Sequence, residues 1–299
     1  MARTLGGRTR RSFGLMRATQ GGTGIHMLPI ILLVATASSS PHYAEERARL
    51  FYRLAGAAYC PEPMLSNWSC APCIAANVTM VAIKLCETYW GRAYVAKFAG
   101  IDGAADAVVV SIRGTNDPQD VMQDLMFAKT DRNMSCPGCQ VHTGFYDAWS
   151  SIHDPVITEV RQLLTSSPPG TPLYVTGHSL GGAIAVIATY DMQNSLGLNV
   201  SEAFTFGEPR VGNAEFAHHF GRAPVTWRVT HFKDPVARLP PRFLGFKHHA
   251  TEIFYDEPST SHVICDGSGE DPKCSTGMPF DPLAVSDHLV YFDELIGAC

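Results

Sequence analysis

Charged residues are scarce in this 299-residue chain, where they make up 17% of the sequence against the roughly 25% usual in soluble domains. The hydrophobic content is ordinary at 45%, so intrinsic disorder and a highly charged coiled coil are both excluded. The sequence also lacks a fixed repeat period of the kind found in collagens and solenoids. One globular domain with a sizeable core fits this composition.

Acidic residues are absent from positions 1–44, which carry five arginines. Removing those five positive charges from the net charge of −5 leaves −10 on the rest of the chain. A domain with that charge repels nucleic acid and anionic membranes through its overall field, although local basic patches are compatible with the total. We therefore expect no nucleic-acid partner.

No apolar run is long enough to cross a bilayer, since the run Met27–Ala37 has only eleven residues. The arginine-rich stretch before it, and Ala35 and Ala37 at its end, are typical of a secretory signal peptide. We predict that residues 1–37 are a targeting segment, that residues 38–299 form the catalytic domain, and that the mature protein is extracellular. The alternatives are an organelle transit peptide, a twin-arginine export signal, or translation from the methionine that begins the apolar run.

All nine cysteines follow this segment, which suits an oxidising compartment. Cys265 and Cys274 enclose a short loop rich in Gly, Asp and Pro, and we expect them to form a disulfide. Spacing does not fix the other pairings, and an odd number leaves one cysteine over. Two C-x-x-C motifs, beginning at Cys70 and Cys136, make a four-cysteine zinc site an alternative. Four glycosylation sequons agree with secretion and begin at Asn67, Asn77, Asn133 and Asn199.

The hydrophobic pattern predicts strands that alternate with helices. Short apolar, β-branched runs predict strands at Ala107–Arg113, Leu173–Thr176, Val200–Phe206 and Trp227–Phe232. Apolar residues at helical spacing, or on most faces, predict helices at Ala44–Ala58, Phe145–Leu164, Ala183–Leu196 and Leu289–Ile296. This alternation predicts an α/β fold with a mostly parallel central sheet covered by helices on both faces.

A nucleophile motif lies between one predicted strand and the next helix. The segment Gly177–Gly182 contains G-x-S-x-G, and its place in a strand-turn-helix unit pushes Ser179 out at the carboxyl edge of the sheet. The helix N-terminus adds backbone N–H donors, of which Leu180 supplies the one directly after the serine. In the simpler alternative, Ser179 only caps the helix.

A serine nucleophile needs a base, and in this kind of fold the chain order is serine, acid, histidine. Asp234 follows a strand-like run and precedes Pro235, so its carboxylate is expected at the same sheet edge as Ser179. The histidines after Asp234 are His248, His249, His262 and His288.

Several sequence blocks, in order, make the chain resemble the class 3 lipases, the filamentous-fungal triacylglycerol lipase type. The blocks are SIRGT, VHTGFYDAW, VTGHSLGG, FTFGEPRVGN, HFKDPVARLPP and DHLVYF, and they extend from about Ala107 to Phe292. The resemblance implies an α/β-hydrolase fold and a secreted serine hydrolase of lipid esters that needs no metal or cofactor.

By match to the family's motifs, Ser179 would be the nucleophile, Asp234 the acid and His288 the general base. The oxyanion hole would be formed by Leu180 and by Thr115, through its backbone N–H and hydroxyl. The alternative for Thr115 is that it only caps a turn. His248, His249 and His262 then take structural or surface roles.

The segment Asn116–Asp124 aligns with the family's mobile lid, and a strand-like stretch, Leu125–Phe127, follows it. Its apolar face has only Val121 and Met122, which favours small or soluble esters as much as long-chain fat; a plain surface loop is the alternative. Short-chain, feruloyl-type or phospholipid esters are therefore alternative substrates, and a non-catalytic binding module is a further alternative. Five residues belong either to an acyl groove or to the core, namely Pro241, Phe243, Leu244, Phe246 and Phe254.

Overall fold

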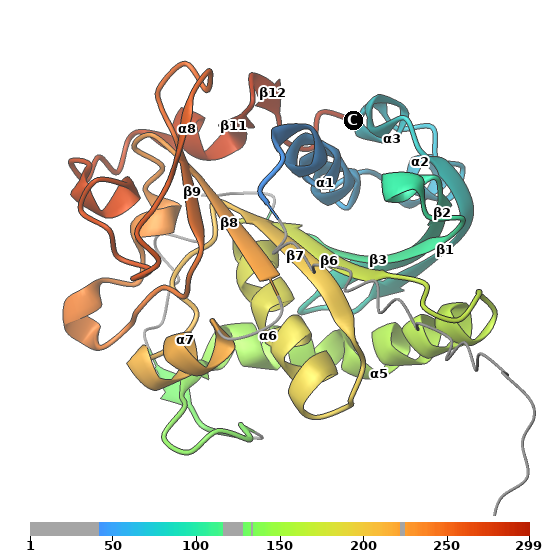
Figure 1. Ribbon diagram of the computed structural model, residues 1–299, viewed down its shortest axis with the longest axis horizontal. Coiled ribbons are helices and arrows are strands. Elements are labelled where there is room, and N and C mark those ends of the chain that lie inside the picture. Colours follow the sequence, from blue (N-terminus) through green and yellow to red (C-terminus); the bar gives the residue numbers. More distant parts are fainter. Residues whose placement is uncertain (1–41, 116–127, 133, 222–224) are drawn as a thin grey trace, which may run out of the picture. The chain divides into compact units, whose positions relative to one another are not determined.

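The computed structural model describes residues 42–115, 128–132, 134–221 and 225–299. Its centre is an eight-stranded sheet in the order β1-β2-β3-β6-β7-β8-β9-β10 (Figure 1). The strands are β1 (Thr79–Glu87), β2 (Arg92–Ala99), β3 (Ala107–Ile112), β6 (Leu173–His178), β7 (Val200–Phe206), β8 (Val225–His231), β9 (Glu252–Tyr255) and β10 (His262–Ile264). The four predicted strands are thus confirmed to within two residues at each end.

Strands β3, β6, β7, β8 and β9 run parallel, while β1, β2 and β10 pair antiparallel at the two edges. The mostly parallel sheet is therefore confirmed. The β1–β2 hairpin was not predicted from the sequence; a lysine interrupts the apolar run of each strand, and β1 is largely half-buried or exposed whereas β2 is mostly buried. In a parallel sheet all carboxyl ends meet at one edge, so β3, β6, β7 and β8 deliver the residues that follow them to one place.

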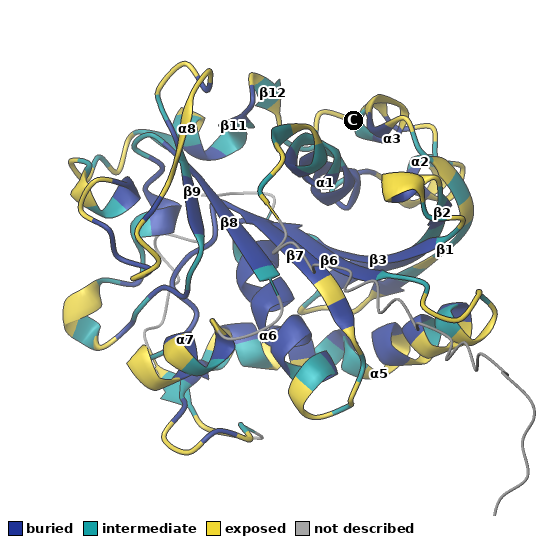
Figure 2. Ribbon diagram, viewed as in Figure 1, coloured by how far each residue is buried: buried dark blue, intermediate teal, exposed yellow. Residues whose placement is uncertain are grey.

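Helices cover both faces of the sheet, whose central strands are buried (Figures 1 and 2). On β3, Val108 and Val110 pack into the cluster that contains α5 and α6, whereas Val109 packs into the cluster that contains α1. This alternation follows from the two-residue period of a strand. The helices are α1 (Glu45–Ala57), α2 (Glu62–Ser66), α3 (Ala71–Ala76), α5 (Thr143–Thr165), α6 (Leu180–Asn194), α7 (Ala214–Phe220) and α8 (Val285–Leu289).

The predicted helix at Leu289–Ile296 is wrong. Helix α8 ends at Leu289, and the chain continues as a small hairpin of β11 (Val290–Tyr291) and β12 (Glu294–Leu295). The two turn residues, Phe292 and Asp293, have φ values of 58° and 61°, which fit a tight hairpin and exclude a right-handed helix. Tyr291 and Phe292 are adjacent and both buried, as a tight hairpin packed into the core allows. The run of apolar residues was therefore a misleading signal for a helix.

Eight of the nine cysteines form disulfides, which are Cys60–Cys299, Cys70–Cys73, Cys136–Cys139 and Cys265–Cys274. The expected Cys265–Cys274 bridge is thus confirmed, and Cys86 is the cysteine left over. Each C-x-x-C pair closes on itself, so the four thiolates of the alternative zinc site are tied up in two disulfides. Burial raises the pKa of the Cys86 thiol to about 11, which keeps it protonated at neutral pH.

Several sequence predictions concern residues outside the described ranges, namely the targeting segment, the lid, the strand-like stretch at 125–127 and the sequon at Asn133. The asparagines of the other three sequons, Asn67, Asn77 and Asn199, are exposed. Within the described ranges, no helix combines the length and apolar character that a membrane crossing requires.

Candidate active site

The chain turns sharply at Ser179, between the end of β6 and the start of α6. Ser179 has φ 59° and ψ −131°, a backbone conformation that is strained for a residue with a side chain. Its backbone N–H donates to the carbonyl of Phe206, at the end of β7, at 2.8 Å. The turn places Ser179 at the carboxyl edge of the parallel strands.

Glycines on both sides of Ser179 allow this turn to form. A Cβ atom at Gly177 would collide with the backbone of Gly181, and a Cβ atom at Gly181 would collide with the carbonyl of Ile112. Because neither position has room for a side chain, the first turn of α6 packs directly against the end of β3. The chain that follows β3 is therefore next to Ser179.

Asp234 and His288 form a buried hydrogen-bonded pair, although they are 54 positions apart in the chain. His288 Nδ1 lies 3.0 Å from Asp234 Oδ1 and 2.9 Å from Oδ2. Oδ2 also accepts a bond from the Tyr291 hydroxyl at 2.6 Å, and Oδ1 accepts one from the backbone N–H of Val236 at 2.9 Å. An ionised carboxylate accepts all of these bonds, so Nδ1 carries the proton and Nε2 of the neutral ring can accept one.

The pKa of Asp234 is lowered from its ordinary value by its partners. Burial by itself raises this pKa, because the charged form loses its hydration. The charge and hydrogen bond of His288, with the hydrogen bond from Tyr291, outweigh that effect. Asp234 is therefore ionised at neutral pH and favours positive charge on the His288 ring.

Gly207 brings the pair close to the nucleophile turn. It follows Phe206, whose carbonyl accepts the Ser179 N–H, and it has a φ of 58°. A Cβ atom at Gly207 would lie 2.7 Å from Asp234 Oδ2 and 2.8 Å from His288 Nδ1. The pair thus packs against the bare backbone of Gly207, directly after the Phe206 carbonyl that accepts from Ser179.

Three polar side-chain atoms at this edge are buried and have no hydrogen-bond partner among the described residues. They are Ser179 Oγ, His288 Nε2 and Thr115 Oγ1. Leu180 is the first residue of α6, so its backbone N–H has no acceptor within the helix. Buried polar atoms without partners are rare and point to a site where a reacting group is bound.

His178, directly before the serine, contacts the backbone carbonyl of His288. Its Nε2 lies 2.8 Å from the His288 carbonyl oxygen, and its Nδ1 lies 3.0 Å from the Tyr59 hydroxyl. A carbonyl only accepts, so Nε2 donates and Nδ1 accepts from Tyr59. Burial, with the nearby charge of His288, lowers the pKa of His178 to about 3, so the ring is neutral.

The other histidines after Asp234 bond elsewhere. His248 Nε2 lies 2.8 Å from the Ala237 carbonyl, and His249 Nε2 lies 3.1 Å from Glu208. His262 is on the edge strand β10, with Nδ1 3.8 Å from Glu45. In the described part of the chain, His288 is therefore the histidine that bonds to Asp234.

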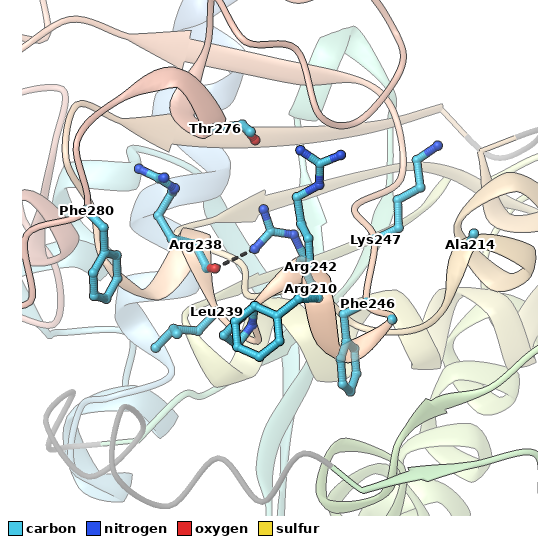
Figure 3. A pocket seen from close by; sticks show the side chains of 12 residues that line it. Arg210, Ala214, Arg238, Leu239, Arg242, Phe246, Lys247, Thr276 and Phe280 are labelled. Carbon is cyan, nitrogen blue, oxygen red and sulfur yellow. Dashed lines mark hydrogen bonds between the residues drawn. The ribbon is translucent and has the colours of Figure 1, made fainter.

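The five residues considered for an acyl groove separate into different environments. Pro241, Phe243 and Phe246 line a cavity of about 910 Å³ (Figure 3), while Leu244 and Phe254 do not. Phe246 is buried and Phe243 is exposed. None of the candidate catalytic residues lines this cavity.

Three side chains at this site were not predicted from the sequence: Tyr59, His178 and Tyr291. His178 was inside the nucleophile motif but occupied its variable position. Tyr291 was assigned to a helix that does not exist, and Tyr59 is 119 positions from the ring that it contacts. In a single sequence no local pattern marks contacts of that separation.

The fold and this edge of the sheet define an α/β-hydrolase with a serine at the strand-helix turn. The sequence model of the family described as lipase (class 3) matches residues 109–244. The chain is 31% identical over 210 residues to the secreted mono- and diacylglycerol lipase A of Penicillium cyclopium, covering 67% of each chain. It is 29% identical over 304 residues to the secreted mono- and diacylglycerol lipase 1 of Fusarium solani, covering 90% of this chain and 88% of that one.

Solved structures agree with these sequence matches. Lipase II from Rhizopus niveus superposes with a TM-score of 0.74 at 28% identity, covering 87% of this chain and 98% of that one. A triacylglycerol lipase described as having a serine protease triad at its catalytic centre superposes with the same TM-score at 27% identity and the same coverage. The chain belongs to the class 3 lipase family, and it is a carboxylic ester hydrolase.

Proposed function

We propose that Ser179, His288 and Asp234 are the catalytic triad of this lipase. The observation that carries the proposal is the bond from His288 Nδ1 to ionised Asp234, which leaves Nε2 unpartnered beside the turn that holds Ser179. Ser179 Oγ attacks the ester carbonyl carbon while its proton passes to His288 Nε2. Asp234 holds the ring in the required tautomer and stabilises its positive charge.

Collapse of the tetrahedral intermediate completes the first half of the reaction. The carbon–oxygen bond to the alcohol breaks, and His288 returns its proton to the departing oxygen. Water, deprotonated by the same nitrogen, then attacks the acyl-Ser179 ester; the bond to Ser179 Oγ breaks, His288 returns the proton to that oxygen, and the carboxylic acid is released.

Negative charge on the carbonyl oxygen is stabilised by Leu180 and Thr115. The Leu180 N–H is at the positive end of α6, directly after the nucleophile. Thr115 follows Gly114, where a Cβ atom would lie 3.2 Å from the Ser179 Cβ, so the backbone that leads into Thr115 passes beside the nucleophile. The absence of a partner for its buried Oγ1 among the described residues supports this role.

The substrate that we propose is an acylglycerol. Support comes from the relatives, which are named as mono- and diacylglycerol lipases or as a triacylglycerol lipase. We also propose that residues 1–37 direct export and that residues 38–299 are the secreted catalytic domain, since two of the relatives are named as secreted. Sequencing the N-terminus of protein collected from the culture medium tests this division, and a mature chain that keeps residues 1–37 would contradict it.

Hydrolysis of tributyrin and triolein, each below and above its solubility limit, tests the proposed function. The wild type is compared with Ser179→Ala and with Ser286→Ala, whose serine is exposed and two residues from His288. We expect only Ser179→Ala to abolish activity. Activity on triolein droplets supports the acylglycerol lipase, activity confined to dissolved tributyrin would make it a short-chain esterase, and full activity in Ser179→Ala would disprove the triad.

A further inference from the structure

The cavity of about 910 Å³ is lined by an unusual mixture of side chains. Four cationic residues, Arg210, Arg238, Arg242 and Lys247, share it with apolar ones. Their charged ends lie on one side in Figure 3, and the rings of Phe246 and Phe280 lie on the other. The volume is within the range of small-molecule sites.

One of the four cations is neutralised by a structural partner. Arg210 donates from Nε and from a terminal nitrogen to the two oxygens of Glu270, both at 2.8 Å. Its other terminal nitrogen donates to the carbonyls of Arg238 and Pro240. Through these contacts the Arg210 guanidinium connects the segments that form the cavity wall.

The other three cations are not neutralised by a close bidentate partner of this kind. In the described part of the chain, neither Arg238 nor Lys247 forms an ion pair, and Arg242 Nε is 3.8 Å from Glu270 with its side chain 61% exposed. Among the described residues, the Arg238 guanidinium donates to the carbonyl of Met278. Burial, together with the positive charge of Arg210, outweighs the opposing charges of Glu270 and Glu252 and lowers the pKa of Arg238. Concentrating positive charge in this way destabilises the free protein, and a bound anion relieves the repulsion.

The apolar side of the cavity is open to solvent. Phe243 is 86% exposed and Phe280 is 51% exposed, both at the cavity wall. Large apolar side chains exposed next to one another mark a binding surface. Three cations beside exposed rings suit a molecule that has one anionic end and one hydrocarbon end.

We propose that this cavity binds a single anionic amphiphile. Arg238, Arg242 and Lys247 hold its phosphate or carboxylate group, and Phe243 and Phe280 contact its hydrocarbon chain. The assignment does not depend on the catalytic roles proposed above, since none of those residues lines the cavity.

Calorimetric titration with four probes tests the proposal: decyl phosphate, decanoate, decan-1-ol and inorganic phosphate. We expect decyl phosphate or decanoate to bind, with an affinity that falls as NaCl is added, and the other two to bind at least tenfold more weakly. The stronger of the two anionic probes identifies the source as a phosphorylated lipid or as a fatty acid.

The double variant Arg242→Gln/Lys247→Gln is expected to weaken binding of the anionic probes about tenfold or more, because it removes two of the three cations that hold the anionic group. Arg161→Gln/Lys84→Gln is the matched control, since it removes the same charge from residues that do not line the cavity. Arg242→Lys keeps the charge and should retain most of the affinity. Equal binding of decan-1-ol and decyl phosphate, equal binding of inorganic phosphate and decyl phosphate, or equal loss in the control variant would overturn the proposal.

Discussion

His178 donates a hydrogen bond from Nε2 to the backbone carbonyl of His288 at 2.8 Å. The residue before the candidate nucleophile thus holds the backbone of the candidate base. The two rings also lie 4.5 Å apart at their centroids. Because Tyr59 donates to Nδ1 of the same His178 ring, it fixes the tautomer that makes this contact.

Tyr59→Phe is therefore expected to lower kcat about tenfold while KM changes little, because a small displacement of the base impairs proton transfer more than binding. Steady-state kinetics on a soluble ester measures the split. Tyr190→Phe is the control, since it removes a hydroxyl that bonds to Ser135 at 2.7 Å, away from the site. An equal loss of kcat in both variants would mean that the effect is one of general stability.

Tyr291→Phe should move the acid limb of the pH–activity profile to higher pH. The Tyr291 hydroxyl donates to Asp234 Oδ2 and helps to keep the pKa of that carboxyl low, so its removal raises the pKa. Activity requires ionised Asp234, and the ionised fraction then falls at a higher pH. A profile with an unchanged acid limb would contradict this role for Tyr291.

Gly207→Ala should abolish most activity, with a loss of at least a hundredfold in kcat, because the new methyl group would displace Asp234 and His288. Gly197→Ala is a close control, since Gly197 has a similar φ of 65° but no atom within 4 Å of the position of a Cβ. Both variants should lose about 1 kcal/mol of stability from backbone strain. Similar activity in the two, measured on a soluble ester, would show that the contact at Gly207 does not matter.

Glu270 should make the stability of the protein depend on pH in the acid range. Burial alone raises its pKa, but the hydrogen bond and charge of Arg210 outweigh it and lower the pKa to about 2 from an ordinary 4.5. The resulting stabilisation is fully present above pH 4.5 and is lost as the pH falls toward 2.

Glu270→Gln should accordingly destabilise the protein by about 3 kcal/mol at pH 7, where it leaves Arg210 buried without a counter-charge. The difference from the wild type should shrink as the pH is lowered toward 2. Urea unfolding at pH 7 and pH 3 measures both values. A difference that stays constant between these pH values would contradict the assignment.

The local parts of this site were predictable from the sequence. The turn at Ser179 follows from glycines at fixed distances between a strand and a helix, and Asp234 follows a strand whose carboxyl end must reach the same edge. In contrast, His288 was one of four histidines that spacing alone could not separate, and only the resemblance to class 3 lipases favoured it. Its contact with Asp234 depends on how the chain after β9 returns to the sheet.

The parts that could not be predicted depend on tertiary contacts. Tyr291 is buried against Asp234, and the neighbouring Phe292 adopts a positive φ, so packing replaced the helix suggested by the run of apolar residues. The β1–β2 hairpin was not predicted because its short apolar runs, each interrupted by a lysine, do not distinguish a strand from part of a buried helix. Whether such a segment forms a strand or a helix depends on its burial by distant elements, and a short sequence window carries no information about that burial.

Covalent trapping tests whether Ser179 is the nucleophile and whether His288 activates it. A p-nitrophenyl alkylphosphonate reacts with an activated serine and remains attached, and peptide mass spectrometry locates the modified residue. The account predicts one phosphonyl group per molecule, on Ser179, with release of one p-nitrophenol, and no labelling in His288→Ala. Labelling at another residue, or undiminished labelling of Ser179 when His288 is replaced, would contradict it.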